Sequence, residues 1–359
     1  MFDDILEFVA KNKQKLIEKI EKLKKETKEE KVRAHWIPYK PEEKQDVNIA
    51  VEDGSYNYIE YKGFVLYALA AEAVGYINEN LLIKKCIDVD VLHPYKYTEH
   101  RIRFYMSTLE KKVALQILSN NNVDFFLLDG SILGDLIRPA AFEKAPSTND
   151  REFIEKKYLD KIKASLEKKE FSRIISKDFV NEIYSSANLE KPLDSIIYLE
   201  YLENLLTVKE LLKYEDKVIG ISKRSQSTSY FPESRVPDIA LFESICRDVG
   251  FSKPIPVKLE YIDRYKRRFP IMDKEIREIP LSLFYARFGK NSTVLKFEYV
   301  GEPSVDRAKE ILDGIAMSTV EGYPYLLRKA HREVVLTQAH IEQIAKILGL
   351  YERTGREML

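Results

Sequence analysis

Cysteine is scarce in this sequence, and the placement of the few cysteines excludes two kinds of scaffold. Among 359 residues there are 2 cysteines, Cys86 and Cys246, which lie far apart and form no Cys-x-x-Cys motif. This spacing argues against a zinc ribbon and against a disulfide framework. Such cysteine usage is typical of a reducing compartment, so we expect an intracellular, cytoplasmic protein.

A long apolar run and an excess of charge of one sign are also missing. No apolar stretch approaches the roughly 20 residues that a membrane-spanning helix needs, and the charged N-terminus is unlike a signal peptide. We therefore expect no membrane segment. The 58 acidic and 58 basic residues balance to a net charge of zero, so any binding of nucleic acid must use local basic patches.

The composition that remains is globular and rich in charge. Hydrophobic residues make up 45% and aromatic residues 11% of the chain, which is enough to bury a large core at this length. Charged residues make up 32% while methionine is scarce, a balance that resembles heat-adapted proteins. The length allows one elaborated domain or two closely packed ones.

The most informative feature is the tripeptide Asp-Gly-Ser, which occurs twice, each time after an apolar run. Residues 48–52 lead into the first copy at 53–55, and residues 125–128 lead into the second copy at 129–131. A short apolar run predicts a buried strand, and Asp-Gly predicts a turn at its exit. Two adjacent strands that end in this way would direct two carboxylates to one point, where a divalent cation relieves their repulsion. The sequence therefore predicts a carboxylate metal site.

Each copy of Asp-Gly-Ser also has simpler interpretations. Asp-Gly after a strand is a common turn sequence, and one copy alone would more often be structural than functional. The pair favours function, because glycine lets the backbone approach a ligand and Ser55 and Ser131 can bond a phosphate or cap the next element. A phosphoryl hydrolase of the haloacid dehalogenase type needs a further aspartate two residues earlier, where Val51 and Leu127 stand, and this argues against that class.

The order of predicted elements favours an α/β fold of the ribonuclease H-like kind, with a mixed sheet flanked by helices. After the first aspartate, residues 63–71 and 85–92 predict two strands of an antiparallel meander, and residues 98–120 predict a helix that carries Glu110. In that fold, acids on the first strand, the first helix and the fourth strand meet around two metal ions. Apolar residues at helical spacing place Glu110 on or beside the buried face, so we expect it to join the two aspartates.

The rest of the chain predicts an N-terminal helix and a helical insertion. The charged amphipathic segment 2–33 predicts one helix, which is more typical of a solvated or dimer-packing helix than of a basic arm for nucleic acid. Residues 150–169 and 192–213 predict polar helices of an insertion that covers the sheet or makes a subunit contact. A strand predicted at 217–221 and a helix predicted at 305–317 belong to the remaining part of the core.

Two basic segments are candidates for binding DNA phosphates. Lys223 and Arg224 belong to a Ser-Lys-Arg-Ser turn that leaves a strand, where they supply charge and hydrogen-bond donors. Further along, Arg267 and Arg268 are interleaved with aromatic residues, as in a groove with stacking rings. The simpler interpretations are a solvated turn for the first segment and core tyrosines for the second.

The last informative segment joins a tyrosine to a histidine. The motif Gly-Tyr-Pro-Tyr begins at Gly322, and Pro324 predicts the start of a helix. Such a helix carries His331 two turns along, toward whatever Tyr323 faces. A lone histidine is more often structural than catalytic, and the second histidine of the His-Glu-x-x-His metalloprotease motif is missing.

Taken in order, these motifs resemble the NurA nucleases of archaea. The resemblance rests on the two Asp-Gly-Ser strand ends, the helical Glu110, the Ser-Lys-Arg-Ser turn and the segment Gly-Tyr-Pro-Tyr-Leu-Leu-Arg-Lys-Ala-His. It extends from about residue 45 to the C-terminus and implies a single NurA-type nuclease domain over residues 1–359. The parts would be an N-terminal helix and arm (1–40), the first part of the core (45–140), a helical insertion (145–215), and the remaining core with C-terminal helices (216–359).

The resemblance also implies an activity, cofactors and partners. It implies manganese- or magnesium-dependent DNA cleavage by two ions, as a 5′ to 3′ exonuclease and single-strand endonuclease, in end resection and double-strand break repair. The implied partners are DNA, a second copy of the chain and a hexameric HerA-type translocase. The implied site residues are Asp53, Glu110, Asp129 and His331 as metal ligands, Tyr323 and Lys223 as further catalytic residues, and Ser55, Ser131, Lys223, Arg224, Arg267 and Arg268 as DNA contacts.

A non-catalytic function is the alternative that the sequence leaves open. The protein would then be a DNA clamp or adaptor that joins a translocase to DNA, and the acids would merely cap strands. Stoichiometric DNA binding without metal-dependent turnover would favour this alternative.

Overall fold

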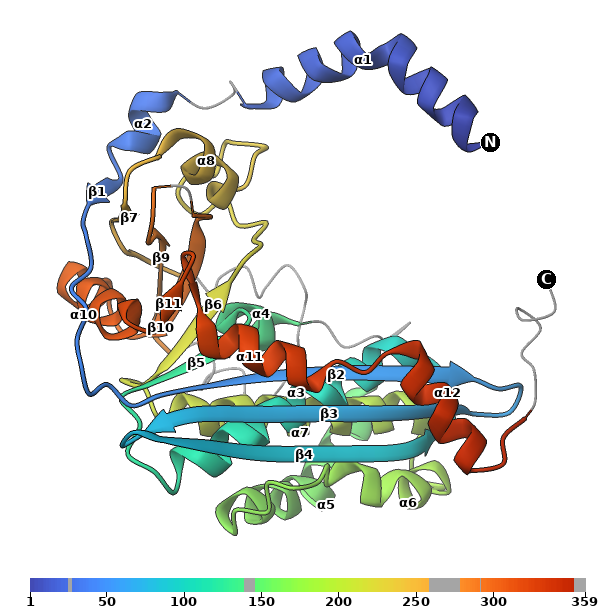
Figure 1. Cartoon of the computed structure of the whole chain (residues 1–359). Helices are drawn as coiled ribbons and strands as arrows, with labels where there is room; N and C mark the ends of the chain where they lie inside the picture. Colours follow the sequence, from blue (N-terminus) through green and yellow to red (C-terminus); the bar gives the residue numbers. More distant parts are fainter. Residues whose placement is uncertain (25–27, 139–145, 258–277, 291, 352–359) are drawn as a thin grey trace.

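The computed structural model describes residues 1–24, 28–138, 146–257, 278–290 and 292–351. In this part of the chain, a mixed sheet of ten strands forms the centre and helices cover both of its faces (Figure 1), which agrees with the predicted α/β class. The strand order is β1-β7-β9-β10-β6-β5-β2-β3-β4, and β8 pairs with β9. The strands are β1 (Trp36–Pro38), β2 (Ile49–Glu60), β3 (Val65–Ile77), β4 (Asn80–Leu92), β5 (Phe125–Asp129), β6 (Val218–Ser222), β7 (Gly250–Ser252), β8 (Ile255–Pro256), β9 (Leu281–Arg287) and β10 (Leu295–Val300).

Three long antiparallel strands, β2, β3 and β4, form one end of the sheet. The prediction that the first strand ends at Asp53 is wrong, because β2 continues through Gly54 to Glu60 and pairs with β3 along its whole length. The tyrosines that follow the tripeptide extend a pattern that favours a strand, and they outweigh the turn preference of Asp-Gly. Asp53 therefore lies within a strand, with its side chain on one face of the sheet and Gly54 facing the other.

Strands β5 and β6 lie beside β2 and run parallel to it. Glu52 of β2 is opposite Leu128 of β5, so one residue further the register brings Asp53 level with Asp129. Asp129 is the last residue of β5, so the predicted strand end is confirmed for this copy. Ser131 then caps α4 (Ile132–Ile137) by accepting a backbone hydrogen bond from its first turn.

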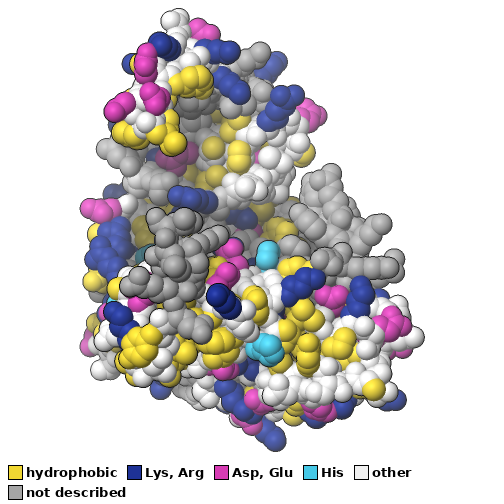
Figure 2. All heavy atoms as spheres, turned by 90° about the vertical axis from the view of Figure 1, so that its right-hand side faces the viewer, with side chains coloured by type: hydrophobic (Ala, Val, Ile, Leu, Met, Phe, Trp, Pro, Cys, Tyr) yellow, Lys and Arg dark blue, Asp and Glu magenta, His cyan; other side chains and the backbone are white. Residues whose placement is uncertain are grey.

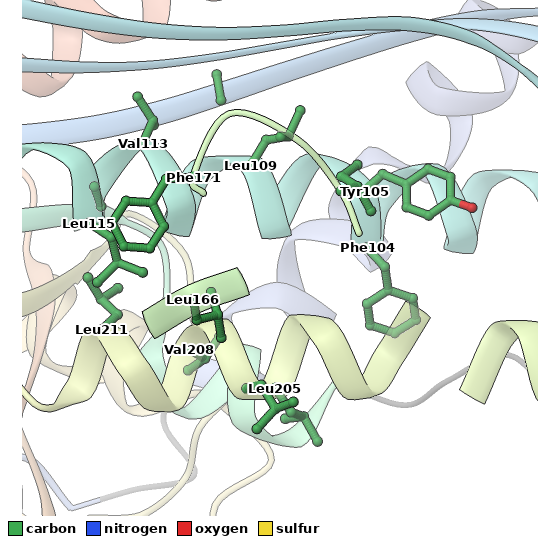
Figure 3. Packing of buried hydrophobic residues seen from close by; sticks show 14 of the residues in the cluster. Phe104, Tyr105, Leu109, Val113, Leu115, Leu166, Phe171, Leu205, Val208 and Leu211 are labelled. Carbon is green, nitrogen blue, oxygen red and sulfur yellow. The ribbon is translucent and has the colours of Figure 1, made fainter. Parts of the chain in front are cut away.

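Two layers of helix cover one face of the meander. Helix α3 (Thr98–Leu118) packs on β2 and β3, and α7 (Pro192–Leu212) packs on α3. In Figure 3, Leu109 and Val113 of α3 point toward the strands, whereas Phe104 points toward α7. Every residue of α7 from Ser195 to Val208 is buried. The helices α5 (Thr148–Glu167) and α6 (Val180–Tyr184), with a short 3₁₀ helix η1 (Ser176–Phe179), complete this layer.

The helix predicted over residues 192–213 is present as α7, but the prediction that it is polar is wrong, because most of its residues are buried. Its two central glutamates are neutralised by α3: Arg101 lies 2.6 Å from Glu200, and Lys112 lies 2.6 Å from Glu203. A buried carboxylate is tolerated when it is paired and hydrogen-bonded. The pattern along one helix does not reveal partners that come from another.

The opposite face of the sheet is covered by three helices near the C-terminus. They are α10 (Val305–Ala316), α11 (Tyr325–Val334) and α12 (Gln338–Ile347), and a small hairpin of β11 (Thr319–Val320) and β12 (Tyr323–Pro324) leads into α11. Val51 and Leu127 of the sheet share a core with Leu312 and Leu327 of these helices. Helix α11 lies along β2 and β3 (Figure 1). Strand β2 is therefore enclosed by α3 on one face and by α11 on the other.

The N-terminal segment forms two helices rather than the single helix predicted over residues 2–33. Helix α1 (Phe2–Lys24) is followed by α2 (Glu29–Arg33), and Lys28 between them has an extended backbone. In Figure 1, α1 extends away from the body, and its apolar side chains, such as Phe8, are exposed. Helix α2 packs against α8 (Asp238–Ile245). Among the described residues, no helix combines the length and apolar character that crossing a membrane requires.

Candidate metal centre

Two aspartates from adjacent parallel strands lie side by side near the middle of the sheet. The register of β2 and β5 brings Asp53 level with Asp129. Together with His331 of α11, each aspartate offers one ligand atom, and these three atoms lie within 4.8 Å of one another. The expected meeting of the two aspartates is therefore observed, although only one of the two strands ends there.

His331 reaches the aspartates because of how α11 begins and packs. Pro324 is the N-cap of the helix, and Leu327 and Ala330 fix its inner face in the core above β2 and β5. His331 Nδ1 lies 2.7 Å from Asp53 Oδ2, and the histidine side chain is 60% exposed. The imidazole is therefore anchored through one nitrogen and open to solvent on its outer side.

Asp129 is held by two other side chains that the sequence also predicted. Lys223, just beyond β6, places Nζ 3.3 Å from Asp129 Oδ2. The Tyr323 hydroxyl donates to Asp129 Oδ1 at 3.4 Å, and Lys223 Nζ lies 4.4 Å from the centre of the Tyr323 ring, a cation–π contact. Burial, followed by the charges of Asp129 and Asp53, raises the pKa of Tyr323. The tyrosine hydroxyl therefore remains a hydrogen-bond donor at neutral pH.

The electrostatics of the aspartate pair fit a divalent cation. Burial, and next the charge of Asp129, raises the pKa of Asp53, while the hydrogen bond from His331 lowers it. Adjacent carboxylates repel each other, and a shared cation removes the repulsion. Carboxylate oxygens suit both Mg²⁺ and Mn²⁺, and an imidazole ligand shifts the preference toward Mn²⁺. Asp53, Asp129 and His331 thus have the donor chemistry of a site for a divalent cation.

Glu110 approaches from the opposite side of β2, where it lies against Gly54. A Cβ atom at Gly54 would stand 2.5 Å from Glu110 Oε1, so the glycine is what allows this approach. Glu110 is not among the three side chains whose ligand atoms lie within 4.8 Å of one another. Burial raises the pKa of Glu110 to about 7 against the opposing charge of Lys111. The carboxylate therefore changes its charge near neutral pH.

A buried charged cluster beside Glu110 was not predicted from the sequence. It consists of Glu52, Lys111 and Asp135, all of which are buried. One signal was present: Glu52 interrupts an apolar strand at a position whose side chain faces a helix, and a buried charge requires a partner. The identity of that partner does not follow from the strand alone.

The residues predicted to contact DNA differ in their hydrogen bonding and exposure. Their contact with DNA stays a prediction for all of them. The Ser55 hydroxyl accepts a backbone hydrogen bond from the segment after α11. Ser131 caps α4 and donates to the buried Glu298, so both serines are used within the protein. Arg224 is exposed next to Lys223. Two predicted contacts lie outside the described residues, namely Arg267 and Arg268.

The surface on the open side of the molecule is hollowed. Figure 2 shows this side, turned from the right of Figure 1, with a recess below the end that carries α1. Lysine and arginine side chains lie at several places around the recess among acidic and hydrophobic ones, and acidic and histidine side chains are exposed below it (Figure 2). Some basic side chains on this side of the neutral chain are therefore accessible to a polyanion.

Comparisons with known proteins agree with these observations. The NurA domain model matches residues 47–336. A probable DNA double-strand break repair nuclease NurA of Methanocaldococcus jannaschii is 32% identical over 377 residues, which cover 99% of this chain and 92% of the relative. The family match and this identity confirm the resemblance that the sequence motifs indicated.

Solved structures share the fold. The crystal structure of the NurA nuclease from Sulfolobus solfataricus matches with a TM-score of 0.74 at 24% identity, over 97% of each chain. A crystal structure of NurA bound to dAMP and manganese matches with a TM-score of 0.71 at 18% identity, over 96% of this chain and 97% of that one. These likenesses concern the arrangement of the chain, while the sequence match over residues 47–336 concerns descent. The chain therefore belongs to the NurA family of nucleases.

Proposed function

We propose that this protein is a metal-dependent deoxyribonuclease that hydrolyses phosphodiester bonds in DNA end processing and double-strand break repair. The observation that carries the proposal is the group of Asp53, Asp129 and His331, whose ligand atoms lie within 4.8 Å of one another. The M. jannaschii relative, 32% identical, is named a probable repair nuclease. The manganese in a related NurA crystal structure agrees with the donor set found here.

We further propose that the core is ribonuclease H-like and that the chain is one domain with the boundaries predicted from the sequence. Support comes from the order β4-β3-β2-β5-β6, in which β2 is central, β3 is antiparallel to it, and β5 runs parallel to it. In this topology an acid on the central strand and an acid on its parallel neighbour meet, as Asp53 and Asp129 do. Glu110 on the first helix after the meander would be the third acid.

Asp53, Asp129, His331 and Glu110 would hold Mn²⁺ or Mg²⁺, and we propose two ions per site. Bound divalent cations supply activation of water and neutralisation of charge on the reacting phosphate. The chain's own residues orient these groups. The hydrogen bond from His331 fixes one oxygen of Asp53, and the Tyr323 hydroxyl fixes one oxygen of Asp129.

Among the described residues, Lys223 is well situated to contact the scissile phosphate. Its side chain is 46% exposed and its ammonium lies 3.3 Å from Asp129, so a phosphate that reaches the aspartates also reaches Lys223. A fixed positive charge there stabilises the additional negative charge of the transition state. Arg224, Ser55, Ser131, Arg267 and Arg268 are proposed to contact the DNA backbone.

Other details rest on family membership. We propose 5′ to 3′ exonuclease and single-strand endonuclease activity, a homodimer, and cooperation with a HerA-type hexameric translocase. The exposed apolar face of α1, with Phe2, Ile5 and Phe8, supports the homodimer, because an unpaired amphipathic helix of this length gains stability by packing. Light scattering of the purified chain tests this, and a monomer at micromolar concentration would contradict it.

The direct test of the nuclease proposal compares Asp53→Asn and Asp129→Asn on labelled DNA with Mn²⁺ and with Mg²⁺. Each change keeps the shape of the side chain and removes its charge. Partners of metal ligands alone cost about 10- to 100-fold when changed, so loss of a ligand is expected to reduce the cleavage rate by on the order of 100-fold or more. The exposed Asp248 provides the control Asp248→Asn. Wild-type cleavage by both site variants would refute the proposal.

A further inference from the structure

The buried ammonium group of Lys111 lies next to the Glu110 carboxylate. Lys111 of α3, whose side chain is 5% exposed, places Nζ 3.1 Å from Glu52 Oε1, 3.3 Å from Glu110 Oε2 and 3.2 Å from Asp135 Oδ2. These three acids come from β2, α3 and α4. Arg138 pairs with the other oxygen of Asp135 at 2.9 Å. One lysine therefore joins three elements around the candidate metal centre.

The contact between Glu110 and Lys111 is unusual for neighbours on a helix. Residues at positions i and i+1 point in different directions around a helix and do not normally face each other. Here the Glu110 carboxylate is held between Lys111, which contacts Oε2, and the backbone at Gly54, next to which Oε1 lies. The two oxygens are thus fixed from two sides, and the carboxylate stays beside Gly54, the residue that follows Asp53 in β2.

We propose that Lys111 is a positioning residue that holds the Glu110 carboxylate over Gly54, oriented for the metal centre. This inference rests on the proposed metal-dependent nuclease function. Lys111 itself touches neither metal nor DNA in this account. Glu52 and Asp135 fix the lysine, and the lysine fixes Glu110.

A positioning role and a purely electrostatic role predict opposite signs for metal binding. A positive charge near the centre repels a divalent cation, so if charge were its only effect, removing Lys111 would tighten Mn²⁺ binding. If Lys111 positions a ligand, removing it releases Glu110 and weakens Mn²⁺ binding. The sign of the change in affinity therefore separates the two roles.

The test measures Mn²⁺ binding by titration calorimetry in the absence of DNA, together with Mn²⁺-dependent cleavage. The variants are Lys111→Met, Glu110→Gln and the double variant with both changes. We expect Lys111→Met to weaken Mn²⁺ binding by about tenfold, a factor typical of a residue that orients a ligand. We expect the double variant to bind like Glu110→Gln alone, because a residue that acts only through Glu110 has no further effect once Glu110 is changed.

Lys112 provides a matched control on the same helix. Its side chain is 0% exposed and its ammonium lies 2.6 Å from Glu203, on the side of α3 that faces α7. Lys112→Met removes a buried paired lysine as Lys111→Met does, and we expect it to lower the unfolding midpoint while Mn²⁺ affinity stays at the wild-type value. Equal losses of Mn²⁺ affinity in both lysine variants would assign Lys111 a general structural role and overturn the proposal.

A second pair of variants keeps the test decisive if Lys111→Met fails to fold. Within the part of the chain that the structure describes, Lys111 donates to Oε1 of Glu52, and Oε2 of Glu52 is buried without a hydrogen-bond partner. Changing Glu52→Gln and Lys111→Met together therefore removes both members of the buried pair. Lys111→Arg keeps the positive charge and donors. We expect weak Mn²⁺ binding in the first and recovery toward wild type in the second.

The outcomes distinguish this proposal from the proposed function. If Glu110→Gln weakens Mn²⁺ binding and cleavage while folded Lys111→Met binds Mn²⁺ as tightly as wild type or more tightly, positioning by Lys111 is refuted and the nuclease assignment stands. If Glu110→Gln itself changes neither Mn²⁺ binding nor cleavage, Glu110 is not a ligand, and both this inference and the proposed ligand set fall.

Discussion

The two copies of Asp-Gly-Ser have the same sequence and different structures. The first lies inside the long strand β2, whereas the second spans the end of β5 and the cap of α4. Both present an aspartate to the same point, because β2 and β5 are parallel neighbours in register. Strand pairing therefore sets the position of each carboxylate, while glycine and serine serve different purposes in the two copies.

The glycines differ most. Gly54 is in contact with Glu110, whereas a Cβ atom at Gly130 would meet no atom of the described residues within 4 Å. Gly54 provides room for a third acid, and Gly130 only joins a strand to a cap. The serines differ as well, since Ser55 accepts one backbone hydrogen bond and Ser131 both caps a helix and donates to a buried glutamate.

The largest difference between the two copies is expected when each glycine is changed to alanine. Gly54→Ala would force Glu110 aside, and we expect about tenfold slower Mn²⁺-dependent cleavage or a larger loss, with about 1–3 kcal/mol lower stability from overpacking. Gly130→Ala should leave both close to wild type, because its Cβ would lie more than 4 Å from every atom in the part of the chain that the structure describes. Cleavage rates and urea unfolding measure the two effects. Equal behaviour of the two variants would show that Glu110 does not depend on Gly54.

The pH dependence of Mn²⁺ binding tests the role of Glu110, the acid for which Gly54 leaves room. Burial raises the pKa of Glu110 to about 7, so this carboxyl is protonated below about pH 7 and must lose its proton before it binds a cation. We therefore expect Mn²⁺ affinity to fall by up to about tenfold per pH unit below about pH 7 and to level off above it.

The control for this pH dependence is Glu110→Gln, which removes the titrating group. Its Mn²⁺ affinity should change less between about pH 6 and about pH 8 than that of the wild type. Calorimetric titrations at several pH values measure both proteins. Parallel curves would mean that another group controls the binding of the cation.

The smallest expected difference is between the serines. Ser131→Ala removes the cap of α4 and the hydrogen bond to Glu298, and we expect a loss of about 1–2 kcal/mol in the free energy of unfolding. Ser55→Ala removes one acceptor, and we expect a loss of about 1 kcal/mol or less. Urea unfolding of the two variants shows which of them loses more of the free energy of unfolding. A larger loss for Ser55→Ala would reverse our account of the two serines.

Much of the site was predictable because its signals are local. An apolar run that meets Asp-Gly marked both aspartates, and helical spacing placed Glu110 beside a buried face. Tyr323 and His331 followed from a proline that starts a helix. In each case the relevant information lies within a few residues of the side chain concerned.

The parts that were not predicted depend on contacts between distant segments. Strand β2 continues past Asp53 because it pairs with β3 along its whole length. Helix α7 was predicted to be polar from its glutamates, but it is buried because residues of α3 pair with Glu200 and Glu203. The cluster around Lys111 joins three elements, and no single element indicates the others. Buried charge is therefore where local patterns were least informative.

The most direct test of the account is a crystal structure of the protein soaked with Mn²⁺, with the metal located by its anomalous scattering. We predict manganese bound by Asp53, Asp129 and His331, with the Glu110 carboxylate directed to the same centre. Manganese bound elsewhere, or no manganese at these residues in crystals that contain saturating Mn²⁺, would contradict it.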